Sequence, residues 1–183
     1  MEIEQPRIIL LTGVPGAGKT SVAGALAAMF PRSAHVEADV LRTCIREGRV
    51  NPGGSPSDEA DRQLVLVTRM VAEVANRLFA EGFTVIVDDV VVTRGRLDGY
   101  LAALRGAPLH YVLLAPSREV VLERDRRRVD KSVAEQYLWL YDRMEQECVG
   151  IGLDLDTSPW DENETAAAIA GAIRDGQGLI RQP

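Results

Sequence analysis

The chain of 183 residues carries a net charge of −6, with 46% hydrophobic and 26% charged residues, which is typical of one soluble globular domain. No apolar stretch reaches the roughly 18 residues of a membrane span, and the acidic start does not resemble a secretory signal. Two distant cysteines favour a reducing cytoplasm, and the negative charge argues against a surface for duplex nucleic acid.

The first predicted element is a strand over residues 7–11, a short apolar run that suits burial on both faces. The sequence GVPGAGKT at residues 13–20 follows and matches the phosphate-loop motif G-x-x-x-x-G-K-[ST] in full. An Ala-rich stretch over residues 19–29 then predicts a helix, which Pro31 ends. The motif therefore lies directly between a strand and a helix, as nucleotide binding requires.

Each residue type in this loop has a chemical reason. Gly13, Gly16 and Gly18 let the backbone turn and bring its N–H groups against phosphate oxygens. The N-terminus of the following helix directs its positive dipole end at the same anion. Lys19 can reach the outer phosphates and assist transfer, and the Thr20 hydroxyl can bind Mg²⁺. The residues expected to bind the nucleotide are Gly13, Val14, Pro15, Gly16, Ala17, Gly18, Lys19, Thr20 and Ser21.

A second strand is predicted over residues 33–38, and a D-x-x-R pattern follows at Asp39 and Arg42. Because Asp39 comes twenty residues after Lys19, both side chains can converge on one cleft. The carboxylate of Asp39 could accept the proton of an attacking hydroxyl, and Arg42 could hold an anionic or polar acceptor. The alternative is a helix N-cap aspartate beside a solvated arginine. We expect His35 to pack rather than to take part in catalysis.

A helix is predicted over residues 40–47, and the composition of residues 51–57 indicates a loop. Ser55 is expected to cap the next helix, with Pro56 at its first position. Apolar residues spaced by three and four define the buried face that we predict for this helix. They are Leu64, Val67, Val71, Val74 and Leu78.

The next predicted strand, residues 83–87, ends at Asp88 and Asp89. An acid at the carboxyl end of a buried parallel strand can hold Mg²⁺ through water, as a Walker B residue does. We assign Asp88 to the metal and Asp89 to the substrate. The alternative is that one of these acids caps the following segment.

Later in the chain, a helix that starts near Ser117 ends in the basic run RDRRR, residues 124–128. Arg124 and Arg128 are four residues apart, so a helix would place both on one face. Two guanidinium groups closing over the γ-phosphate would stabilise the charge that develops and exclude water, so residues 124–136 are expected to form a short lid. The alternative is a solvated basic run at a helix end. The other elements expected are helices over residues 94–104, 133–147 and 161–174 and strands over residues 109–114 and 153–155.

Together, GVPGAGKT, the D-x-x-R pattern, the VIVDD strand end and RDRRR resemble the P-loop small-molecule kinases related to chloramphenicol phosphotransferase. The polynucleotide kinase domain, the gluconate kinases and the zeta-toxin-like kinases are similar, and the resemblance extends over residues 8–173. Membership implies a three-layer α/β P-loop NTPase fold with a five-stranded parallel sheet in the order 2-3-1-4-5. Helices would cover both faces, with the lid after the fourth strand. It also implies that Asp39 is the catalytic base.

The sequence thus predicts one domain over residues 1–183 that uses ATP and Mg²⁺ to phosphorylate a hydroxyl group of a small molecule. A GTPase is disfavoured because no Asn-Lys-x-Asp element is present, and an oligomeric ATPase module usually has a longer chain. One alternative is a kinase of polynucleotide or nucleotide 5′ ends, which would need a basic track toward Asp39. Another is a regulatory nucleotide-binding module, which would need no base. The acceptor and the oligomeric state are left open.

Overall fold

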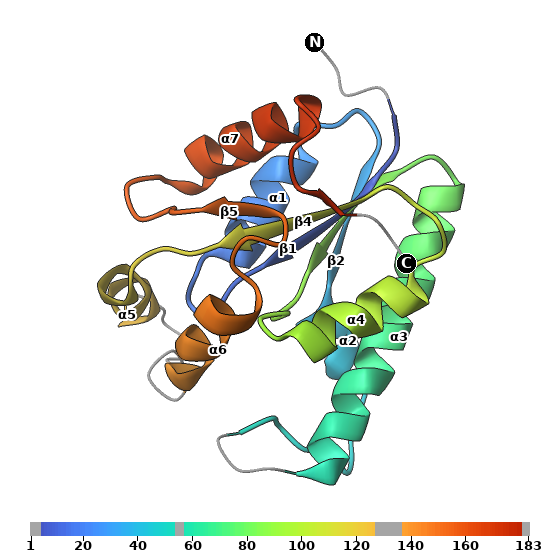
Figure 1. Cartoon of the computed structure of the whole chain (residues 1–183). Helices are drawn as coiled ribbons and strands as arrows, with labels where there is room; N and C mark the ends of the chain where they lie inside the picture. The colour runs from blue at the N-terminus through green and yellow to red at the C-terminus, as the bar shows by residue number, and fades with distance from the viewer. Residues whose placement is uncertain (1–4, 54–56, 127–136, 181–183) are drawn as a thin grey trace.

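The centre of the structure, a computed structural model that describes residues 5–53, 57–126 and 137–180, is a twisted sheet (Figure 1). Five parallel strands lie in the order β2-β3-β1-β4-β5, which confirms the predicted order. The strands are β1 (Ile8–Thr12), β2 (Ser33–Glu37), β3 (Thr84–Asp88), β4 (Leu109–Leu114) and β5 (Leu153–Leu155). A short strand that was not predicted, β6 (Leu179–Ile180), pairs antiparallel with β4.

Helices cover both faces of the sheet, as predicted. α1 and α7 pack together on one face, and α3 and α4 pack together on the other (Figure 1). The helices are α1 (Lys19–Ala27), α2 (Ala38–Arg42), α3 (Asp58–Ala80), α4 (Arg94–Ala103), α5 (Arg118–Arg126), α6 (Trp139–Glu147) and α7 (Glu162–Arg174). Within the described ranges, no helix has both the length and the apolar character needed to cross a bilayer.

The three inner strands form the centre of the core. Every residue of β1, β3 and β4 is buried, because each strand has helices above and below it. Burial of these continuous apolar runs is the main favourable contribution to folding. The inner strands therefore give a rigid base to the loops that leave their carboxyl ends.

The start of α3 differs from the prediction. Ser57 is its N-cap, and its hydroxyl accepts a hydrogen bond from the backbone N–H of Ala60, whereas Ser55 and Pro56 lie outside the described residues. The helix predicted over residues 40–47 is also shorter, because α2 ends at Arg42 and turns follow.

The buried face of α3 was only partly predicted. Val67 and Val71 are buried as expected, but Val74 is exposed. Small and polar side chains complete the buried face, and a search for large apolar residues cannot find them. They are Ala60, Gln63, Thr68, Ala72 and Ala75.

Candidate functional site

The phosphate loop joins the end of β1 to the start of α1 at the carboxyl edge of the sheet (Figure 1). Gly13 has φ +153°, and a Cβ at this position would lie 2.6 Å from the carbonyl oxygen of Leu114, so only glycine fits. Gly18 is the N-cap of α1 in the left-handed conformation, and no side chain in the described ranges caps this helix. The N–H groups of its first turn are therefore available to an anion.

The other predicted loop residues surround this turn. Val14, Gly16, Ala17 and Lys19 are buried, and the remaining ones, Pro15, Thr20 and Ser21, are half-buried or exposed. The Lys19 ammonium donates a hydrogen bond to the carbonyl of Val14 at 3.2 Å, so its charged end lies over the loop. This position is suitable for contact with the outer phosphates of a nucleotide.

Thr20 and Asp88 meet at the edge where β1 and β3 end. The Thr20 hydroxyl donates a hydrogen bond of 2.7 Å to Oδ2 of Asp88. Both side chains offer the hard oxygen ligands that Mg²⁺ prefers, and this ion usually takes its other ligands from phosphates and water. No group of three or more His, Cys, Asp or Glu side chains in the described part of the chain could hold a metal by itself. The pair therefore fits Mg²⁺ bound together with a nucleotide.

The surroundings of Asp88 keep its carboxylate ionised. Burial alone would raise the pKa of Asp88, but its contact with His35 and the nearby Lys19 charge lower it, so the pKa lies below its ordinary value. His35 Nε2 lies 3.6 Å from the same Oδ2 that accepts the Thr20 hydrogen bond. The sequence alone does not reveal this contact, because it depends on the pairing of His35 with Ile86 in neighbouring strands.

Asp39 lies in the first turn of α2, and its role as an N-cap is excluded because Glu37 occupies that position. The Asp39 side chain is 80% exposed, and Oδ1 lies 3.9 Å from Nε of the mostly buried Arg42. Glu37, the last residue of β2, pairs in register with Asp88, which contacts Thr20. Asp39 comes two residues after Glu37. The exposed carboxylate is thus at the same edge of the sheet as the phosphate loop.

Asp89 takes part in a buried network, although it was predicted to bind substrate. Its Oδ1 accepts a hydrogen bond from the next backbone N–H, and its Oδ2 accepts from Arg96 at 2.5 Å and from the Tyr100 hydroxyl at 2.7 Å. Burial, with the nearby Asp89 charge, raises the pKa of Tyr100, so the phenol keeps its proton and donates. Arg96 also donates to the hydroxyl of Thr68. Asp89 therefore connects the end of β3 to α4 and α3.

Arg124 lies against the phosphate loop. Its guanidinium donates to the carbonyl of Ala17 at 3.3 Å and to the carbonyls of Thr157 and Trp160 at 2.8 and 3.1 Å. Arg124 thereby joins α5 to the loop and to the segment after β5, which the sequence analysis did not assign to the site. Arg128 and the predicted lid residues 127–136 lie outside the described residues.

Comparison with known proteins places this geometry in context. A family model described as an AAA domain matches residues 8–145. A search of curated proteins finds no match.

Among solved structures, a sugar kinase from a Janibacter species has a TM-score of 0.69 at 18% identity, over 92% of this chain and 95% of that chain. The tunicamycin resistance protein of Deinococcus radiodurans has a TM-score of 0.66 at 23% identity, over 97% and 99% of the two chains. A gluconokinase from Sinorhizobium meliloti has a TM-score of 0.59 at 20% identity, over 96% and 99%. At these identities the similarity shows a shared fold, which is the one that the motifs predicted.

Proposed function

This chain belongs to the P-loop family described as an AAA domain, and on that premise we propose that it is a kinase. It transfers the γ-phosphoryl group of ATP to a hydroxyl group of a small-molecule acceptor. The observation that carries the proposal is the Thr20–Asp88 contact beside the phosphate loop, with the exposed carboxylate of Asp39 at the same sheet edge. A regulatory nucleotide-binding module would not need that third group.

Binding of ATP uses the loop backbone and Lys19. The N–H groups at the start of α1 hold the phosphate oxygens, and the Lys19 ammonium moves from the Val14 carbonyl to the outer phosphates. Thr20 and Asp88 would hold Mg²⁺, which neutralises charge on the phosphates when it is bound. Both groups come from rigid elements, so they position the γ-phosphate before the acceptor arrives.

Transfer uses Asp39. Its carboxylate takes the proton of the acceptor hydroxyl as the acceptor oxygen forms a bond to the γ-phosphorus. The bond from that phosphorus to the β–γ bridging oxygen breaks, and ADP leaves with that electron pair. Arg42 holds the acceptor from the next turn of α2. Arg124 and Arg128 are proposed to stabilise the negative charge that develops on the phosphoryl oxygens.

The class of acceptor that we propose is supported by two similar structures and by the charge of the chain. Two of the similar proteins are described as a sugar kinase and a gluconokinase, which supports a small polyhydroxy acceptor. A net charge of −6 does not favour a nucleic-acid end. We propose that residues 1–183 act as one domain with a lid over residues 124–136. We also propose a cytoplasmic location, because the proposed reaction consumes ATP and the two cysteines are free.

The test has two stages, so that failure of nucleotide binding is separate from failure to find the acceptor. In the first, Mg-ATP should raise the melting temperature, Lys19→Ala should remove most of the rise, and Arg62→Ala, an exposed control, should keep it. In the second, sugars, polyols, nucleosides and 5′-hydroxyl oligonucleotides are incubated with Mg-ATP, and phosphorylated products are detected by mass spectrometry. Absence of any shift contradicts nucleotide binding, and a preference for oligonucleotides would favour the end-kinase alternative.

A further inference from the structure

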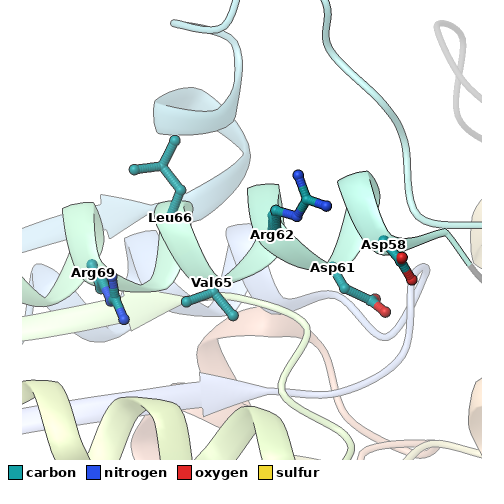
Figure 2. A pocket seen from close by; sticks show the side chains of 6 residues that line it. All are labelled: Asp58, Asp61, Arg62, Val65, Leu66 and Arg69. Carbon is teal, nitrogen blue, oxygen red and sulfur yellow. The ribbon is translucent and has the colours of Figure 1, made fainter.

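The outer side of α3 has a shallow groove of about 600 Å³ that only residues of this helix line (Figure 2). We call it the α3 face. Its residues are Asp58, Asp61, Arg62, Val65, Leu66 and Arg69. At its centre, Val65 and Leu66 are 50% and 48% exposed. An exposed apolar centre with charged side chains around it is the arrangement expected of a surface that contacts another molecule.

The groove extends from α3 onto α4. A second groove of about 440 Å³ lies between these two helices and shares Val65 and Arg69 with the first. Gly95, Gly99 and Ala102 of α4 line this second groove. Small side chains let another helix approach closely, so the combined surface fits an elongated partner rather than a compact ligand.

Three charges on this face, those of Asp58, Asp61 and Arg69, have no partner among the residues that the structure describes. Asp61 and Arg69 each stand four residues from Val65, and Figure 2 shows all three side chains on the same side of the helix. Two nearby arginines are paired: Arg62 lies 3.5 Å from Glu59, and Arg105 pairs with Glu73. Of these three charges, Asp61 and Arg69 stand at equal sequence distances on either side of the exposed Val65.

We propose that the α3 face binds a second copy of this chain, with the two α3 helices antiparallel and Val65 near the twofold axis. A twofold axis at Val65 relates the two copies. It places the residue four positions before Val65 in one copy next to the residue four positions after Val65 in the other copy. Asp61 of each copy then meets Arg69 of the other, so that two ion pairs flank the valines. Val65 loses its exposure to water in the same arrangement.

The charge pattern favours this occupant over other partners. An acidic peptide would leave Asp61 without a partner and a basic peptide would leave Arg69 without one, whereas a second copy pairs both. α3 has 23 residues and is about 35 Å long, so the overlap around Val65 can extend several turns and continue onto α4. A stable interface needs roughly 800 Å² from each copy, and a long helix with an adjoining groove can supply such an area.

The experiment exploits the symmetry of the pairs. Sedimentation equilibrium of the wild type should give twice the monomer mass of 20.0 kDa. Asp61→Arg alone and Arg69→Asp alone each place like charges opposite each other, and each should raise the dimer dissociation constant at least about tenfold. Mixed together, the two variants again present opposite charges, and they should form a heterodimer that native mass spectrometry resolves.

Controls separate the interface from folding. Val65→Glu places a charge at the centre of the exposed face and should abolish the dimer while circular dichroism and the melting temperature show a folded chain. Glu145→Arg, a charge reversal at an exposed site on α6, should leave the dimer unchanged. A monomeric wild type at high micromolar concentration overturns the proposal. A wild-type dimer that survives Val65→Glu and both charge reversals also overturns it, because the contact would then use another face.

Discussion

The Thr20 hydroxyl lies 2.7 Å from a carboxylate oxygen of Asp88, although the two residues are 68 positions apart in the chain. The contact joins the first turn of α1 to the end of β3 and fixes both oxygens on rigid elements. Neighbouring groups lower the pKa of Asp88 despite its burial, so the carboxylate carries its charge at neutral pH. A charged, buried oxygen ligand next to a phosphate loop is suitable for a metal ion that accompanies a nucleotide.

Asp88→Asn should weaken the action of Mg²⁺ more than the binding of ATP. The amide keeps the shape and accepts the Thr20 hydrogen bond, but it removes the negative charge that attracts the cation. We expect the Mg²⁺ concentration that gives half of the ATP-dependent rise in melting temperature to increase at least about tenfold. Asp98→Asn, at an exposed site on α4, is the control and should behave as the wild type. An unchanged Mg²⁺ titration in Asp88→Asn would show that this carboxylate does not hold the metal.

Asp39→Asn should reduce turnover and leave nucleotide binding almost intact. The side chain is 80% exposed and is not the cap of α2, so its loss does not disturb the fold. General-base assistance typically contributes about 10²- to 10⁴-fold, and we expect a reduction of kcat in that range. The affinity for ATP, measured by calorimetry, should stay within a few-fold of the wild type. Glu47→Gln is the matched control and should turn over as the wild type does. Wild-type turnover in Asp39→Asn as well would show that Asp39 is not a catalytic residue.

The phosphate loop could be predicted because its determinants are local. Three glycines, a lysine and a threonine at fixed spacing form the loop wherever a strand precedes and a helix follows. The roles of Asp88 and Asp89 could not be separated in this way. Adjacent residues at a strand end point to opposite sides, so Asp88 faces Thr20 on α1 while Asp89 faces Arg96 on α4. Which helix covers which face depends on the whole topology.

The contact of His35 with Asp88 could not be predicted for a similar reason. It requires β2 to lie beside β3 with His35 opposite Ile86, two residues before Asp88. Gln63 illustrates the same limit on α3. Its amide is buried because it bonds to the carbonyl of Gly48 and the N–H of Val50, and hydrophobic spacing gives no sign of these partners.

Arg124→Ala should lower kcat and kcat/KM together if Arg124 stabilises charge that develops only during transfer. The guanidinium already lies against the phosphate loop, 3.3 Å from the carbonyl of Ala17. Arginines supplied in this way contribute roughly 10³- to 10⁵-fold in other phosphoryl-transfer enzymes, and we expect a smaller effect because Arg128 can share the role. Arg128→Ala should therefore lower both constants as well.

Hydrogen exchange tests the lid part of that prediction. Residues 124–136 should exchange more slowly when ATP and acceptor are both bound than when neither is present. Equal exchange with and without ligands, or unchanged kinetics in both arginine variants, would show that the basic run is only a solvated helix end.

Asp89→Ala should destabilise the fold strongly. The variant leaves the mostly buried guanidinium of Arg96 without its carboxylate partner, and loss of one member of a buried ion pair typically costs about 3–5 kcal/mol. Glu73→Ala is the matched control, since it removes a carboxylate from the exposed Arg105 pair, where the expected cost is at most about 1 kcal/mol. Urea unfolding measures both changes. Similar small losses in the two variants would show that the Asp89 network has no structural role.

His110 should make the stability depend on pH just below neutrality. Its ring is buried in β4, and Nδ1 lies 2.9 Å from the carbonyl oxygen of Gln177, so the neutral ring carries its proton on Nδ1. Burial lowers the pKa of His110 and outweighs the opposing effect of this backbone contact. The unfolded chain takes up a proton near the ordinary pKa of about 6.5, whereas the folded chain takes it up only at lower pH.

Between these two pKa values the unfolded state binds more protons, so stability is full above pH 7 and falls as the pH decreases through 6.5. The slope can reach about 1.4 kcal/mol per pH unit for this one group. His110→Gln keeps a donor for the Gln177 carbonyl and removes the titration, so its unfolding free energy should change less between pH 7.5 and 5.5. Urea unfolding at several pH values compares it with the wild type, and His35→Asn controls for the other histidine. Parallel pH profiles of the unfolding free energy in the wild type and His110→Gln would show that His110 does not cause the pH dependence, because the two proteins differ only at this residue.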